Sequence, residues 1–214
     1  MQPGGRAPAP GELALVQAFA NSKDLLTAQD VFTGPEMLRA WLTTRHLLAK
    51  DETISEEDFR RALAFREALR ALVRANNGAA IDANTLEVLN QGAEGARLSL
   101  RFAGDGHSRL EPGASGLDGA VGRLLSIVFT AMNQGTWARL KACRNEECQW
   151  VYYDTSKNRS GSWCMMAMCG NRVKTHTYRR RRKERRDDGT PDASVTHRQR
   201  HPRSQAFHRQ QASR

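Results

Sequence analysis

The chain has 214 residues, with 33 Lys/Arg against 23 Asp/Glu and a formal net charge of +10. It lacks both a run of about 18 apolar residues and a secretory signal sequence, so the sequence predicts neither a membrane-spanning helix nor a membrane partner. These features favour a cytoplasmic protein, associated with the nucleoid if its source is bacterial.

Residues 1–10 are expected to form a flexible leader, after which apolar residues recur at helical spacing. A first helix is predicted over residues 12–21. A second is predicted over residues 33–48, with Thr33 as its N-cap and Pro35 in its first turn. The residues expected on the buried face of this second helix are Met37, Leu38, Trp41, Leu42 and Leu48.

A third helix, predicted over residues 55–75, has the clearest pattern, because Ser55 and Asp58 form a near capping box ahead of a long apolar stripe. That stripe comprises Phe59, Leu63, Leu69, Leu72 and Val73. A shorter helix is expected over residues 82–91, opened by Asp82 or Asn84.

The alternation of Leu98, Leu100 and Phe102 then predicts a strand, and residues 104–106 predict the turn of a β-hairpin. A very apolar helix is expected over residues 117–132, at the centre of the core. Its apolar residues are Val121, Leu124, Leu125, Ile127, Val128 and Phe129. Residues 11–136 are thus predicted to form one helical domain, large enough to bury its own core.

Two histidines in this domain, His46 and His107, are the candidates for catalysis. Neither has a Cys or Ser partner in a local motif, and a catalytic site needs such a nucleophile–base pair. We therefore expect the protein not to be an enzyme.

All four cysteines lie in the C-terminal part, at Cys143, Cys148, Cys164 and Cys169. Two local pairs separated by 15 residues are typical of a tetrathiolate zinc site, although four residues rather than the commoner two lie within each pair. A disulfide framework is the alternative, but nothing in the sequence indicates an oxidising compartment. We therefore expect a zinc ion with a closed, structural coordination sphere.

The segments beside the cysteines predict a small finger over residues 137–186. A strand before Cys143 and a second strand within residues 149–154 are expected to pair, with the first cysteine loop as their turn. The residues after Cys169 accept a helix that Asn171 can cap. The predicted fold is therefore mainly α with small β content: a helical domain containing one hairpin, followed by a treble-clef-like zinc finger.

Positive charge is concentrated in this part of the chain. Residues 137–214 hold 19 Lys/Arg against 7 Asp/Glu, whereas residues 1–136 have a net charge of −2. This split predicts a polyanionic partner, and a solvated basic tail is the alternative. Residues 187–214 are expected to be disordered.

The residues expected to contact double-stranded DNA follow the last cysteine: Arg172, Lys174, Arg179, Arg180, Arg181, Arg182 and Lys183. Positive charge all round a helix suits attraction to phosphate groups. For Arg172 an internal role in supporting the finger is the alternative.

Trp163-Cys164 and the tetrapeptide 169–172, Cys-Gly-Asn-Arg, followed by Val-Lys, resemble the CGNR zinc-finger family. The front half is similar to the ABATE domain, a family associated with stress-induced transcription regulation. The matching stretches there are FANS (19–22), PEMLRAWL (35–42) and REALRAL (66–72). The resemblance implies a regulatory front domain joined to a DNA-binding finger.

The leading hypothesis is therefore a DNA-binding transcription regulator of the stress response, whose helical domain senses a ligand or partner. The sequence leaves open a small-molecule effector and a homodimer. The alternatives are a zinc-dependent protein-interaction module and RNA binding, for which the stacking candidates are Trp150, Tyr152, Tyr153 and Trp163.

Overall fold

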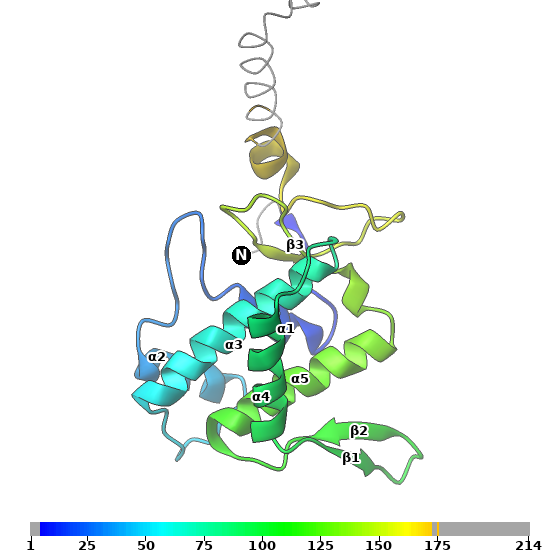
Figure 1. Ribbon diagram of the computed structural model, residues 1–214. Coiled ribbons are helices and arrows are strands. Elements are labelled where there is room, and N and C mark those ends of the chain that lie inside the picture. Colours follow the sequence, from blue (N-terminus) through cyan, green and yellow to red (C-terminus); the bar gives the residue numbers. More distant parts are fainter. Residues whose placement is uncertain (1–4, 173–174, 176–214) are drawn as a thin grey trace, which may run out of the picture. The chain divides into compact units, whose positions relative to one another are not determined.

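The computed structural model describes residues 5–172 and residue 175. Five α-helices are present in this part of the chain: α1 (Leu13–Ala20), α2 (Pro35–Thr44), α3 (Glu56–Ala75), α4 (Ala83–Gly95) and α5 (Gly116–Asn133). Two antiparallel hairpins accompany them, one made of β1 (Ser99–Phe102) and β2 (Ser108–Glu111), the other of β3 (Leu140–Ala142) and β4 (Val151–Tyr153). Figure 1 shows the helices crossing one another, with the first hairpin beside α5. The predicted fold class, mainly α with small β content, is confirmed.

The ends of the helices follow local capping chemistry. Ser55 and Asp58 form a complete capping box at the start of α3, and Asp82 accepts a hydrogen bond from the Thr85 amide at the start of α4. Thr33 does not cap α2, because the N-cap is Gly34 and no side chain bonds there. Within the described residues, no helix is both long enough and apolar enough to cross a membrane.

The core lies between α1, α3 and α5 and includes an aromatic cluster. The ring of Phe19 lies 5.6 Å from the rings of both Phe32 and Trp41, and 6.1 Å from that of Phe65. Half of the residues of α5 are buried, including four of the six apolar residues expected in the core, but Phe129 is 47% exposed. The expectation that Phe129 belongs to the centre of the core is therefore wrong, because its side chain lies on the outer face of α5.

Two other expected apolar faces differ from the structure. Met37 is 49% exposed, and Leu48, although buried, lies beyond the end of α2 at Thr44. The predicted hairpin is present, with Leu100 opposite Leu110, but Leu100 is 52% and Phe102 is 78% exposed. The hairpin has two faces and packs on α5 through β2, so the face turned away from α5 stays in solvent.

The largest fully buried side chains belong to two arginines of α3, Arg66 and Arg70. Arg66 donates two hydrogen bonds to the Asp30 carboxylate, at 2.8 and 2.9 Å. A buried charge must be paired in this way, because leaving water without a partner is costly. Buried arginines of this kind lie outside the apolar stripe by which the sequence marks a buried helix face.

The second hairpin shares the helical core. Leu140, Ala142 and Val151 are buried in the same apolar cluster as the helices, and the side chain of Asn21 bonds both the N–H and the carbonyl of Val151. The predicted boundary between residues 136 and 137 thus falls inside one continuous core. The predicted disordered tail, residues 187–214, lies outside the described residues.

Part of the predicted leader is also in contact with the rest of the chain. Ala9 is buried and its amide donates to the Gln17 side chain. Arg6 bonds the backbone carbonyls of Trp163 and Cys164. Residues 1–4 lie outside the described part.

Candidate metal centre and basic segment

The fold brings the four cysteines together. Cys143 follows β3 directly, and Cys148 closes the loop that leads to β4. Cys164 lies just before the short helix η3 (Met166–Gly170), and Cys169 lies within that helix. All four side chains are buried and all four Sγ atoms lie within 4.8 Å of one another. The first and last of these cysteines are 26 positions apart in the sequence, and the fold brings all four into one compact cluster.

The geometry fits a four-coordinate metal ion. Cys164 Sγ lies 3.6 Å from both Cys148 Sγ and Cys169 Sγ, whereas a disulfide requires about 2 Å. Four sulfurs placed tetrahedrally at metal–sulfur distances of about 2.3 Å would be about 3.8 Å apart. The donor set is thus that of a closed tetrathiolate site, as the sequence predicts.

The protonation chemistry of the cluster also calls for a cation. Hydrogen bonds from Cys148 and Cys164 lower the pKa of Cys143, so one thiolate forms readily. The pKa of Cys164 is raised, first by its hydrogen bond to Cys143 and then by the one to Cys148. Four thiolates at such short range repel one another, and a divalent cation supplies the positive charge that allows all of them to ionise.

The first cysteine loop is built around Asn145, which is buried. Its backbone carbonyl accepts from the Cys148 amide at 2.9 Å, and its side-chain carbonyl accepts from the Glu147 amide at 3.3 Å. The side-chain amide of Asn145 points to Cys169 Sγ, 3.9 Å away. The loop of the first pair therefore contacts a sulfur of the second pair, an arrangement that orients metal ligands in other proteins.

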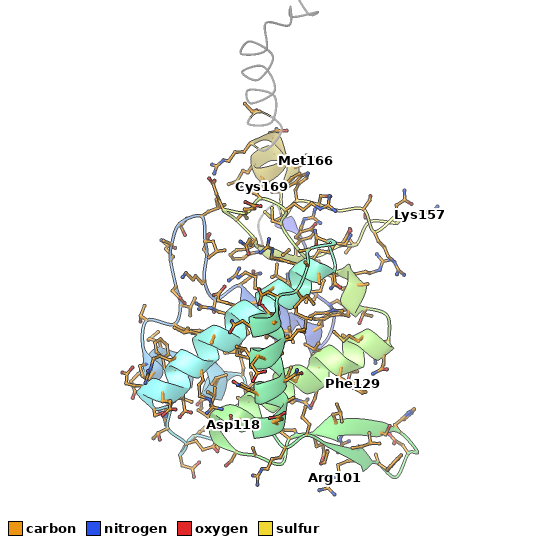
Figure 2. The ribbon with its side chains drawn as sticks, viewed as in Figure 1. Arg101, Asp118, Phe129, Lys157, Met166 and Cys169 are labelled. Atoms are coloured by element: carbon orange, nitrogen blue, oxygen red, sulfur yellow. The ribbon has the colours of Figure 1, made fainter. Side chains whose placement is uncertain are left out.

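The second pair depends on Gly170. A Cβ at this position would overlap Met166 Sδ and lie 3.2 Å from Trp163 Cδ1. Met166 itself is 55% exposed, and Figure 2 shows it beside Cys169 on the same short helical turn. The glycine next to Cys169 thus allows the helix to pack closely on Trp163.

Between β4 and the second pair, a loop is organised by Asp154. Its carboxylate accepts from the Ser156 and Gly161 amides and from Lys141 Nζ, the last at 2.9 Å. Burial alone would raise the pKa of Asp154, but the hydrogen bonds from Ser156 and Lys141 outweigh it, and the pKa is lowered. Lys157 lies at the outer end of this loop (Figure 2).

The basic segment begins one residue after the cluster. Asn171 has helical backbone angles and does not act as the N-cap, because the helix already starts at Met166, with Met165 as its N-cap. Arg172 is exposed and its Nη1 lies 3.8 Å from Glu147 Oε2 in the first cysteine loop. The other predicted DNA contacts lie outside the described residues: Lys174, Arg179, Arg180, Arg181, Arg182 and Lys183.

Several residues around the cluster carry no sequence signal of their own. Arg6, Arg70 and Asn145 each bond a cysteine or a residue next to one. The sequence around the two arginines does not mark them as neighbours of a metal centre, because the carbonyl groups that they bond lie far away along the chain. Only the position of Asn145 between Cys143 and Cys148 could have marked it.

Comparison with known families agrees with this geometry. Residues 139–182 match the model of the CGNR zinc finger, and residues 13–132 match that of ABATE, the family described as "Putative stress-induced transcription regulator". No curated protein matched the chain. The two matches follow each other in the order that the sequence motifs indicate, and they fit a role in transcription regulation. Because the ABATE model covers more than half of the chain, the protein belongs to the ABATE family and carries a CGNR zinc finger behind that domain.

Proposed function

We propose that the protein is a DNA-binding transcription regulator in which a zinc ion fixes the start of a basic DNA-contacting segment. The observation that supports this most directly is the burial of four converging sulfurs immediately before that segment. Zinc is the metal that suits four thiolates without redox chemistry, and a closed set of four ligands is typical of structural sites. A binding role rather than catalysis is part of the proposal.

The case for DNA is electrostatic. Residues 170–186 contain nine Lys/Arg and one acidic residue, Glu184, whereas residues 1–136 have a net charge of −2. Such a segment gains affinity for a duplex through phosphate contacts that release bound counterions. Attachment to the metal cluster would give the segment a fixed starting point, because Cys169 and Arg172 belong to one helical run.

RNA binding receives less support. The aromatic residues that would stack on bases are engaged elsewhere: Tyr152 is fully buried, and Trp150 and Trp163 pack against the cysteine cluster. Stacking on unpaired bases requires accessible ring faces.

We further propose that the helical domain senses a ligand or a partner. A surface depression of about 490 Å³ lies between the segment that follows α1 and the finger, lined by Asn21, Ser22, Asp24, Gln29, Asp30, Val31 and Trp150. An effector bound there would touch both the ABATE region and the residue that precedes β4. We propose this depression as the site of a ligand. A homodimer is a separate proposal, and the mass of the protein in solution tests it.

A protein-interaction role is the second candidate, because two methionines between the metal-binding cysteines are exposed. Met166 is 55% and Met168 is 49% exposed. Flexible methionine side chains on a surface suit contact with a protein partner. Binding to a protein that survives high salt and competitor DNA would favour this role.

The experiment for the leading proposal is metal analysis combined with DNA binding. Purified full-length protein under reducing conditions should contain one zinc per chain and bind duplex DNA. Cys169→Ser should lose both, because the remaining three thiolates leave the site open and the helix start unfixed. Ser160→Ala, in the loop between the pairs, serves as a control that should keep both. Zinc-free wild-type protein that still binds DNA with full affinity would contradict the proposal.

A further inference from the structure

Each cysteine pair is held from outside the finger by an arginine. For the first pair this residue is Arg70 of α3, whose side chain is 2% exposed. Arg70 Nη1 donates to the carbonyl of Gln149, the residue after Cys148, at 3.4 Å. Its Nη2 donates to the carbonyls of Ala20 and Lys23, at 2.6 and 3.1 Å. One buried guanidinium therefore joins α3, the end of α1 and the first cysteine loop.

For the second pair the residue is Arg6, near the N-terminus. Arg6 Nε donates to the carbonyl of Cys164 at 2.7 Å, and Nη2 donates to the carbonyl of Trp163 at 3.1 Å. The guanidinium also lies 4.5 Å above the ring of Tyr152, which belongs to the cysteine cluster. These three contacts of Arg6 are all with the finger, although more than 150 residues separate Arg6 from Trp163 and Cys164 in the chain.

These contacts matter because of the net charge that the cysteine cluster would carry with a metal ion bound. Four thiolates around one divalent cation carry a net charge of about −2 in a buried place. An uncompensated charge of that kind is expensive to keep away from water. Arg6, from the segment before α1, and Arg70, from α3, each bring a positive charge to the backbone beside one cysteine pair. Arg70 also pairs with Glu67 through its Nε, at 3.1 Å, so the guanidinium is held in place on α3 as well as beside the first cysteine loop.

We propose that Arg6 and Arg70 are positioning residues of the metal centre, which hold the backbones of the two cysteine pairs and offset the negative charge of the loaded site. The metal would then be retained by the chain from residue 6 to Cys169 rather than by the finger alone. This inference rests on the metal site proposed above. It also links that site to the ABATE region, because Arg70 belongs to α3 and bonds the end of α1 as well as Gln149.

Arg6 is the cleaner test of the two. Loss of Arg70 also removes bonds between α1 and α3, so the variant could unfold for reasons unrelated to the metal. Arg6→Met leaves those helical contacts intact and keeps an apolar side chain over Tyr152. Arg45→Met is the matched control, since Arg45 lies over the Trp41 ring at 4.0 Å and donates to the Trp41 carbonyl, away from the cysteines.

The experiment measures how tightly full-length protein holds zinc in competition with a chromogenic chelator at neutral pH. We expect Arg6→Met and Arg70→Met to weaken zinc affinity about tenfold or more, the range seen when residues that orient metal ligands are replaced. Arg45→Met should match wild type. Arg6→Lys and Arg70→Lys should retain part of the affinity, because they keep the charge but lose the paired hydrogen bonds.

Thermal unfolding of the metal-free proteins completes the test. Arg6→Met should unfold like metal-free wild type, which would show that its effect concerns the bound metal. The inference is overturned if Arg6→Met holds zinc as tightly as wild type and Arg45→Met. If wild-type protein itself holds no zinc, the metal proposal fails instead, so the two failures are distinguishable.

Discussion

At the level of single residues, the tetrapeptide 169–172 supplies a metal ligand, a position without a side chain and a positive charge. Cys169 supplies a sulfur, Gly170 makes room for Met166 and Trp163, and Arg172 lies in solvent beside Glu147. The ion pair of Arg172 is exposed and loose, so it contributes little to stability. Its exposed position leaves Arg172 free to contact a ligand as well.

The close packing at Gly170 gives a prediction that two variants can separate. Gly170→Ala should cost about 1 kcal/mol of stability, because the new methyl group displaces Met166. In a Met166→Ala background the same substitution should cost less, since the close contact with Trp163 remains but alanine favours a helix more than glycine does. Urea unfolding of the zinc-loaded proteins measures both. An equal cost in the two backgrounds would show that Met166 is not the obstacle.

At the scale of elements, the loop after β4 is ordered by a buried ion pair rather than by apolar contacts. Asp154 and Lys141 are 1% and 7% exposed, and the Gly161 amide donates to the Asp154 carboxylate at 2.8 Å. Lys141 Nζ also donates to the carbonyls of Arg159 and Gly161. The exposed side chain of Lys157 is therefore carried on a fixed backbone.

Removing the carboxylate charge should weaken this element in a pH-dependent way. Asp154→Asn should destabilise the protein by about 3 kcal/mol at neutral pH, because Lys141 is left as an unpaired buried charge. The folded-state pKa of Asp154 is lowered, so its stabilising effect is present above the unfolded pKa of about 4 and is lost as the pH falls further. The difference between wild type and variant in chemical unfolding should shrink accordingly at acid pH. A difference that grows on acidification would contradict this assignment.

At the scale of the whole molecule, the finger and the helices are joined by buried polar contacts. Asn76 donates to the carbonyls of Trp137 and Leu140, and Asn77 accepts from the Ala142 amide. On the other strand, Asn21 pairs with Val151. Both strands of the small hairpin are thus bonded by side chains of the helical region.

This arrangement predicts that the metal stabilises the helices as well as the finger. Full-length protein treated with a strong chelator should melt at a lower temperature when followed by the far-UV circular dichroism of its helices. A ligand present at about a thousand times its Kd stabilises the folded state by about 4 kcal/mol. Cys169→Ser with added zinc should melt like the chelated protein. A helical melting temperature that ignores the metal would show that the two regions unfold separately.

The sequence was informative where the physical cause is local. Ser55 and Asp58 lie three residues apart, and the cysteine spacing reflects two tight loops, so both could be recognised directly. The contacts of Arg70 with Gln149 and of Asn21 with Val151 span 79 and 130 residues. No periodicity indicates such pairs, because they depend on how the finished elements pack. The exposure of Phe129 has the same origin, since an apolar sequence does not show which face finds a neighbour.

We propose that the basic segment behind the metal cluster binds DNA through phosphates, and the salt dependence of the affinity for a duplex separates this role from binding to a protein. For zinc-loaded full-length protein, fluorescence anisotropy should give a slope of log affinity against log salt of about −4 to −5, as expected for about five phosphate contacts. The triple variant Arg180→Ala/Arg181→Ala/Arg182→Ala should flatten that slope by up to about 3. A wild-type affinity that does not change with salt would contradict the account and favour a protein partner.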